Sequence, residues 1–188
     1  MSTSPYAYRI SRPSNLKITI AGSVSKADGH APTPIRSGSA REPQWPVGVV
    51  GSITHTANFR AAAVAPRSLV ASIGIDAEPN ESLPDGVEDA VAIAGEPEML
   101  AKLACAFPAT HWGRVLFSAK EAVYKTWYPL TGRWLGFESA SLTIDPRGTF
   151  AARLLIDGTR KDGEPPLTEL RGRFLVARGL IATAAILP

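Results

Sequence analysis

The sequence contains almost no cysteine, and this scarcity excludes two kinds of stabilised fold. Its single thiol, Cys105, cannot form an internal disulfide or build a structural zinc site from thiolates. The surrounding Leu-Ala-Cys-Ala-Phe segment predicts that Cys105 is a small buried hydrophobic residue. A nucleophilic role is the less favoured alternative, because no histidine is placed in the sequence to support it.

The sequence also lacks a long apolar run and a secretion signal. No uncharged apolar stretch reaches the roughly 18 residues that a membrane-spanning helix requires. Residues 1–20 carry Arg9, Arg12 and Lys17 among polar residues, without the apolar centre of a signal peptide. We therefore expect a cytoplasmic protein. The 188 residues, 45% apolar and 20% charged, favour one globular domain or two small fused ones.

Charge is unevenly distributed along the chain. Residues 1–75 have a net charge of +6, residues 76–100 contain eight acids and no base, and residues 101–188 have a net charge of +5. This alternation suggests a site that holds both a cation and an anion. A solvated helix face is the simpler interpretation of most acids between residues 81 and 98. A nucleic-acid-binding module would also be basic, but no recognition motif is present.

Hydrophobic periodicity and turn residues predict an α+β fold. A turn at Trp45 and Pro46 leads into a short predicted strand that ends near His55. Further predicted strands lie at residues 59–65, 68–75, 137–144, 149–155, 170–176 and 180–186. Helical character is predicted within residues 84–103, with a break at Pro97, and most clearly at residues 111–127. The last four strands form two hairpins, and this order favours α+β over a doubly wound sheet. Residues 1–40 are poorly patterned.

The helix predicted at residues 111–127 has a lysine in an unexpected place. An apolar stripe is formed by Leu116, Ala119, Val123 and Trp127. Lys120 falls inside that arc, where an ammonium group is costly unless an anion meets it or its stem reaches solvent. Glu121 and Lys125 lie on the opposite side of the helix, where a surface ion pair is the simplest interpretation.

Two further segments carry candidate chemistry. A β-branched strand ends at Asp76 and Glu78, and alternation places both carboxylates on one side, as ligands of a hard divalent cation require. Residues 51–56 read Gly-Ser-Ile-Thr-His-Thr, and their amides and side chains can contact a phosphate. Taken alone, the Asp-x-Glu pair is weak evidence, and a lone His55 is more often a structural histidine.

Taken together, these segments resemble the 4′-phosphopantetheinyl transferases of the larger, enterobactin- and surfactin-synthetase-activating type. Residues 51–55 read Gly-Ser-Ile-Thr-His, residues 73–78 read Ile-Gly-Ile-Asp-Ala-Glu, and residues 117–125 read Phe-Ser-Ala-Lys-Glu-Ala-Val-Tyr-Lys. All three match the family pattern in type and order, and the resemblance covers roughly residues 41–188.

The resemblance implies an enzyme that moves the phosphopantetheine arm of coenzyme A to a serine of an apo carrier protein, releasing adenosine 3′,5′-bisphosphate. It implies a fold of two similar α+β halves with coenzyme A between them. By similarity, Asp76, Glu78 and Glu121 hold Mg²⁺, which suits a cation that takes few carboxylates and several substrate and water oxygens. Glu121, directly or through a metal-bound water, is the expected base for the serine.

The resemblance also assigns contacts with coenzyme A. Lys120 and Lys125 are expected at the pyrophosphate, with Lys125 stabilising or protonating the leaving phosphate. This would give Lys120 a substrate anion, rather than a protein carboxylate, as its partner. Asp76 is also expected to contact coenzyme A. In the first half, the expected phosphate and adenine contacts are Ser52, His55 (at the 3′-phosphate) and Arg41.

The expected organisation has three parts: a poorly patterned segment at residues 1–40, the remainder of a shortened first half at 41–75, and a second half with the metal site at 76–188. The expected partners are apo carrier proteins of nonribosomal peptide, polyketide or fatty acid synthesis, in secondary metabolism including siderophore biosynthesis. We expect a monomer and no binding of nucleic acid or membrane. The alternative is a non-catalytic or truncated remnant that only docks carrier proteins.

Overall fold

The computed structural model describes residues 34–38, 42–56 and 59–188, and its centre is a five-stranded antiparallel sheet. The strands lie in the order β5-β9-β8-β7-β6. Their bounds are β5 (Ser72–Pro79), β6 (Ala140–Asp145), β7 (Thr149–Leu154), β8 (Glu169–Ala177) and β9 (Leu180–Leu187). Both predicted hairpins are present. The turn between β8 and β9 has positive φ at Arg178 and Gly179, as a tight turn matched to strand twist requires.

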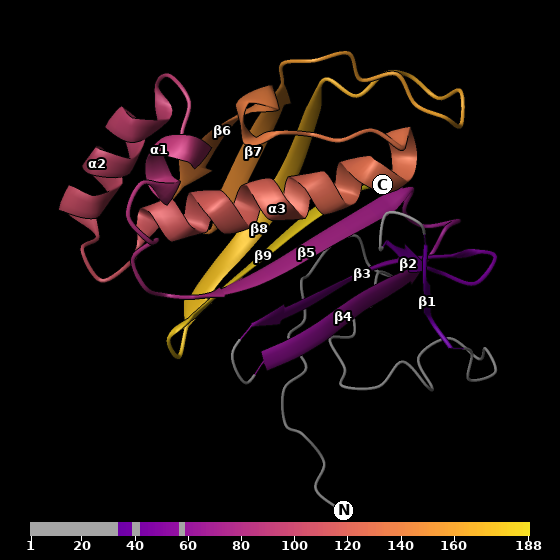
Figure 1. Ribbon diagram of the computed structural model, residues 1–188, viewed down its shortest axis with the longest axis horizontal. Helices are drawn as coiled ribbons and strands as arrows, with labels where there is room; N and C mark the ends of the chain where they lie inside the picture. Colours follow the sequence, from indigo (N-terminus) through magenta and orange to yellow (C-terminus); the bar gives the residue numbers. More distant parts are fainter. Residues whose placement is uncertain (1–33, 39–41, 57–58) are drawn as a thin grey trace, which may run out of the picture.

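One long helix, α3 (Trp112–Thr131), lies across this sheet (Figure 1). Its predicted apolar stripe is fully buried, with 0% exposure at Leu116, Ala119 and Trp127. The helix ends where Gly132 adopts a left-handed conformation, which lets the backbone turn without steric cost. The helix predicted at residues 111–127 is therefore confirmed and extends one turn further.

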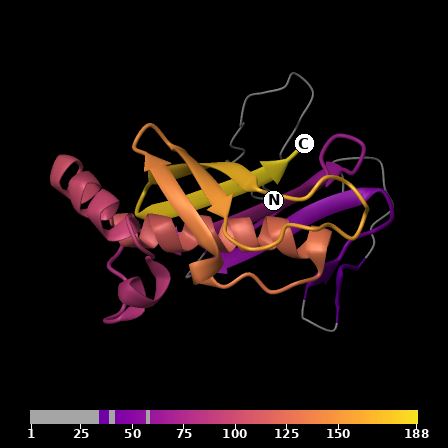
Figure 2. The same cartoon turned by 90° about the horizontal axis from the view of Figure 1, so that it is seen from above.

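Two shorter helices, α1 (Val87–Val91) and α2 (Glu96–Ala106), cover the beginning of α3 (Figure 2). The two helical pieces predicted within residues 84–103 are present, but the break lies at residues 92–95 and not at Pro97. That proline belongs to the first turn of α2, where it costs no backbone hydrogen bond. The burial predicted for Cys105 is also wrong, since Cys105 is exposed. The buried face of α2 is formed by Glu96, Leu100 and Leu103 instead.

A second, smaller layer is formed by the hairpin of β3 (Val49–Thr56) and β4 (Phe59–Pro66), beside β5 in Figure 1. It packs on the side of β5 and β9 that α3 does not cover. The buried residues of this cluster are Val50, Ala61, Ala63, Ala65, Val70, Ile73 and Ile75. A two-stranded arm, β1 (Arg36–Ser37) and β2 (Pro43–Gln44), precedes it.

The strand predicted at residues 68–75 begins later than expected. The amides of Leu69 and Val70 both donate to the carbonyl of Pro66, so this segment is a turn, and β5 starts only at Ser72. None of the helices in the described ranges is long and apolar enough to cross a membrane.

Candidate active site

The close packing of β5 on α3 places Asp76 beside the helix. Gly74 makes this approach possible, because a Cβ at that position would lie 2.0 Å from the carbonyl oxygen of Ala122. Two residues further along, Asp76 faces the same helix and is only 6% exposed. Strand β5 continues to Pro79, so Glu78 follows on the same side, as the sequence predicted.

Asp76 is held by three donors from two elements, β3 and α3. Lys125 Nζ on α3 lies 2.7 Å from Oδ1, and Thr54 Oγ1 on β3 lies 3.1 Å from the same oxygen. Ser118 Oγ on α3 donates to Oδ2 at 2.9 Å. The surface pair considered for Glu121 and Lys125 is therefore wrong, because the lysine pairs with Asp76.

Glu121 lies one turn before Lys125 and completes an acidic cluster with Asp76 and Glu78. Burial raises the pKa of Glu121 most, and the charges of Asp76 and Glu78 raise it further, while Lys125 opposes the shift. No hydrogen bond to the Glu121 carboxylate comes from any residue that the structure describes. Its oxygens are therefore open to a substrate or an ion.

Glu78 has its own cationic neighbour, which the sequence did not reveal. Arg114 NH1 lies 3.2 Å from Glu78 Oε2, and the same guanidinium donates to the carbonyls of Glu81 and Ser82. Burial and the charge of Asp76 raise the pKa of Glu78, whereas Arg114 lowers it. The available signal was helical spacing, since Arg114 precedes Glu121 by two turns on one face of α3.

The chemistry of this donor set fits a divalent cation. Three carboxylates lie close enough to influence one another's protonation, and the nearby ammonium and guanidinium do not return the pKa of Glu78 and Glu121 to ordinary values. Mg²⁺ uses a few carboxylates of this kind together with phosphate and water oxygens. Within the described ranges, no group of three or more acidic, histidine or cysteine side chains is arranged so that it could hold a metal ion by itself.

The raised pKa values predict how stability depends on pH without metal. Above pH 4.5, which is the ordinary pKa of a glutamate, the folded protein binds more protons at Glu78 and Glu121 than the unfolded chain does. Its free energy of unfolding therefore falls as pH rises through the raised pKa values. We expect Glu121→Gln to stabilise the protein near pH 7 in EDTA, with the gain disappearing below about pH 4.5.

Urea denaturation at several pH values measures this effect. The matched control is Glu98→Gln, which changes an exposed carboxylate on α2 and should give no such pH-dependent gain. Loss of stability in Glu121→Gln at neutral pH would contradict the electrostatic description of the cluster.

Comparison with known proteins assigns the chain to a family. Residues 72–170 match the model of the 4′-phosphopantetheinyl transferase superfamily, and residues 19–65 match the 4′-phosphopantetheinyl transferase N-terminal domain. The chain belongs to the 4′-phosphopantetheinyl transferase superfamily. The predicted α+β transferase fold and the prediction of a phosphopantetheinyl transferase are thereby confirmed.

Individual relatives agree with this assignment. The chain is 51% identical over 164 residues to 4′-phosphopantetheinyl transferase PptT of Mycobacterium tuberculosis, covering 85% of this chain and 71% of that protein. It is 52% identical over 157 residues to the transferase Svp of Streptomyces mobaraensis, covering 83% of this chain and 63% of that protein. It is 48% identical over 164 residues to Npt of Nocardia iowensis, covering 83% of this chain and 72% of that protein. The aligned part therefore spans about two thirds of each relative's length.

The division of this transferase at residues 40 and 75 stays a prediction. The match to the N-terminal domain begins at residue 19, within the segment that the sequence left poorly patterned. Arg41, expected near the adenine and 3′-phosphate, lies outside the described residues.

Lys120 of the transferase is buried, but its expected partner is wrong. Its Nζ donates to Glu96 Oε2 at 2.8 Å and to the carbonyls of Val91 and Phe137 at 2.8 and 2.9 Å. Burial lowers the pKa of Lys120, and the ion pair with Glu96 opposes that shift. With a protein carboxylate and two carbonyls as acceptors and 3% exposure, Lys120 is a core residue that does not need a substrate anion.

Glu96 itself was missed, because sequence reasoning assigned most acids between residues 81 and 98 to a solvated face. It is 1% exposed, and it also accepts the amides of Ile93 and Leu142 at 2.8 and 2.7 Å. The carboxylate thus joins α2, α3 and β6. The only signal was Lys120 within an apolar stripe, which implied a buried anion without identifying it.

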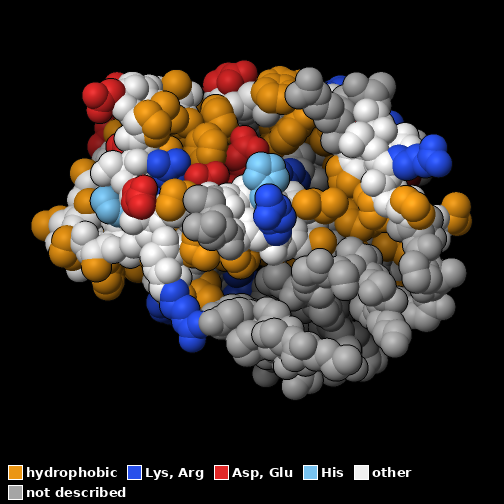
Figure 3. Space-filling model, turned by 60° about the horizontal axis from the view of Figure 1, so that its bottom comes forward, with side chains coloured by type: hydrophobic (Ala, Val, Ile, Leu, Met, Phe, Trp, Pro, Cys, Tyr) orange, Lys and Arg blue, Asp and Glu red, His pale blue; other side chains and the backbone are white. Residues whose placement is uncertain are grey.

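The segment at residues 51–56, which the sequence predicted to contact phosphate, has both buried and exposed side chains. Ser52 is 3% exposed and its hydroxyl accepts the amide of Ile75 at 3.0 Å, so the phosphate role expected for that hydroxyl is not supported. His55 is exposed, and the strand register places Arg60 of β4 directly opposite. On the face in Figure 3, a histidine side chain lies between basic and acidic ones.

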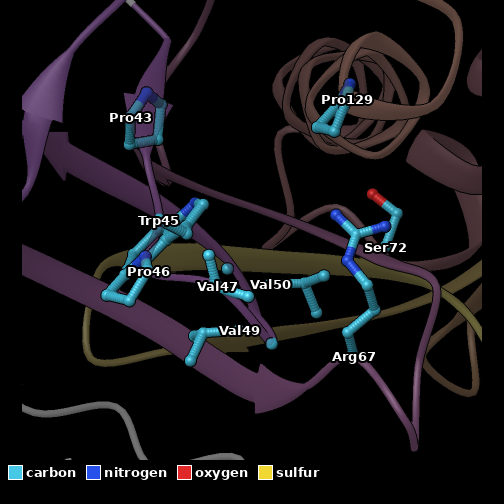
Figure 4. Close-up of a pocket in the computed structure, with 11 residues that line it drawn as sticks. Pro43, Trp45, Pro46, Val47, Val49, Val50, Arg67, Ser72 and Pro129 are labelled. Carbon is cyan, nitrogen blue, oxygen red and sulfur yellow. The ribbon is translucent and has the colours of Figure 1, made fainter.

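A separate pocket of about 370 Å³ lies at the other end of β5 and contains no carboxylate among its lining residues. Trp45, Val50, Ser72 and Pro129 line it, and the side chain of Arg67 extends beside Ser72 (Figure 4). Since Asp76 lies four residues beyond Ser72 and Glu121 two turns before Pro129, this pocket is distinct from the acidic cluster.

Proposed function

We propose that this transferase binds coenzyme A with Mg²⁺ at Asp76, Glu78 and Glu121 and modifies the serine of an apo carrier protein. The observation that carries the proposal is the meeting of these three acids with Lys125, from β5 and α3, in one partly buried cluster. When bound, Mg²⁺ would offset the charge that develops on the pyrophosphate during the transfer.

The reaction exchanges one phosphorus–oxygen bond for another. The serine oxygen bonds to the phosphorus that carries the pantetheine arm, while the bridging bond of the pyrophosphate breaks and adenosine 3′,5′-bisphosphate leaves. Glu121 takes the proton of the serine. Its carboxylate accepts no hydrogen bond from the described residues, so it can receive that proton without breaking a protein contact.

Lys125 is placed to serve the leaving phosphate. Its ammonium lies 2.7 Å from Asp76 Oδ1 and 3.1 Å from the carbonyl of Ile75, and its side chain keeps 26% exposure. It can therefore turn toward a bound pyrophosphate, where its charge stabilises the departing oxygen or its proton neutralises it. Lys120 and Ser52 are not part of this proposed site.

The test of the reaction is carrier-dependent release of adenosine 3′,5′-bisphosphate, measured by chromatography. One equivalent of bisphosphate per modified carrier is the expected result, and a panel of carriers from peptide, polyketide and fatty acid synthesis defines the preference. Carrier binding without release would contradict the proposal and support a docking remnant. We expect the active species to be a monomer by light scattering.

His55 and Arg60 are proposed to bind the 3′-phosphate of coenzyme A. They face each other across β3 and β4, and both are exposed. Arg60→Ala should raise the KM for coenzyme A about tenfold, the loss of one exposed charged contact, with little change in kcat.

Dephospho-coenzyme A, which lacks the 3′-phosphate, distinguishes a direct contact from an indirect effect. With this substrate, Arg60→Ala and the parent enzyme should have the same KM. Arg171→Ala, on an exposed face of β8, is the matched control and should behave as the parent with both substrates. A KM raised equally for both substrates would rule out a 3′-phosphate contact.

A further inference from the structure

Two hydroxyls of β3 complete the hydrogen bonding of β5, the edge strand of the main sheet. Strand β5 pairs with β9 on one side only. On its other side, the amide of Ile75 donates to Ser52 Oγ at 3.0 Å, and the amide of Ala77 donates to Thr54 Oγ1 at 3.1 Å. Buried amides need acceptors of this kind, so the two hydroxyls replace a neighbouring backbone.

The two hydroxyls differ in one respect. Thr54 Oγ1 also donates to Asp76 Oδ1 at 3.1 Å, whereas Ser52 makes no contact with that carboxylate among the bonds of the described residues. Because Thr54 Oγ1 accepts the amide of Ala77, the direction of its own proton is restricted. That proton is therefore held toward Asp76.

The second oxygen of Asp76 is held in the same way from the helix. Ser118 Oγ donates to Oδ2 at 2.9 Å, and Ser118 is 0% exposed. The two hydroxyls thus bind one carboxylate oxygen each, from opposite elements. Both are neutral, so they do not compete with a cation for the carboxylate, as the ammonium of Lys125 does.

From these contacts we propose that Thr54 and Ser118 are positioning residues that fix the carboxylate of Asp76 for cation binding. The inference rests on the proposed metal site. Lys125 can leave Asp76 for the pyrophosphate, and the two hydroxyls then keep the carboxylate plane in place. Thr54 also makes the affinity of the second half for its cation depend on β3 of the first half.

The test is Mn²⁺ binding to the full chain without coenzyme A, followed by electron paramagnetic resonance. Thr54→Val, which keeps the shape but removes the hydroxyl, should weaken binding about tenfold, the loss of one charge-assisted hydrogen bond. Thr54→Ser, which keeps the hydroxyl, should bind nearly as the parent does. Ser52→Ala is the matched control, because it removes an equivalent strand contact that does not touch Asp76, and should change affinity less than about twofold.

The outcomes separate the two proposals. Equal weakening of Mn²⁺ binding in Thr54→Val and Ser52→Ala would show that Thr54 has only a structural role. That result would overturn this inference but not the proposed metal site. If Asp76→Asn binds Mn²⁺ as tightly as the parent does, or if the parent binds no Mn²⁺, both the proposed metal site and this inference are overturned. If circular dichroism shows that Thr54→Val does not fold, Ser118→Ala decides: about tenfold weaker binding supports positioning, and unchanged affinity overturns it.

Discussion

Asp76→Asn is expected to lower phosphopantetheinyl transfer by at least about a hundredfold while leaving the protein folded. The amide loses the charge that a divalent cation requires, and it also removes the ion-pair partner of Lys125. Glu121→Gln should have an effect of similar size, because it removes both a cation ligand and the proposed base. Initial rates of carrier modification at saturating coenzyme A measure both effects.

Mg²⁺ titration separates loss of affinity from loss of chemistry. In Asp76→Asn, the Mg²⁺ concentration required for half-maximal rate should rise. The matched control is Asp85→Asn, an exposed acid of the same acidic block, which should keep parental rates. Near-normal turnover of Asp76→Asn at the parental Mg²⁺ optimum would contradict the assignment of Asp76.

Lys120→Met is expected to destabilise the fold by about 3–5 kcal/mol, because it leaves Glu96 charged and buried without its cation. The carbonyls of Val91 and Phe137 lose their donor as well. Urea unfolding measures the loss. The double variant Glu96→Gln, Lys120→Met should lose less unfolding free energy than the sum of the losses of the two single variants. With both charges removed, no uncompensated charge stays buried.

Lys102→Met, which removes an exposed lysine of α2, serves as the control and should leave stability within about 0.5 kcal/mol of the parent. Unchanged stability of Lys120→Met, together with a raised KM for coenzyme A, would contradict the core role of Lys120. It would support the pyrophosphate contact that the sequence first suggested.

The sequence predicted those parts of the site that depend on local periodicity. The stripe of Leu116, Ala119 and Trp127 identified the buried face of α3, so the side on which Glu121 and Lys125 lie followed directly. The strand before Asp76 identified where that carboxylate lies. The meeting of strand and helix came from the family resemblance, because spacing alone does not pair elements that are 40 residues apart.

The parts that the sequence missed depend on tertiary contacts. Glu96 and Glu98 are neighbouring acids of one helix, yet Glu96 is buried with Lys120 and Glu98 is exposed. Which of them is buried depends on how α2 packs, and no local pattern encodes that. Ser52 was interpreted as a phosphate ligand for the same reason, since its hydroxyl meets β5 only in the folded chain.

Mass spectrometry of an apo carrier protein tests the central claim most directly. The carrier is incubated with this chain, coenzyme A and Mg²⁺, beside parallel reactions with EDTA and with Glu121→Gln. We predict a gain of about 340 Da, the mass of one phosphopantetheine arm, that is absent with EDTA and strongly reduced with the variant. A gain that persists in EDTA would contradict the role of the metal, and no gain from the folded parent chain would contradict the proposed activity.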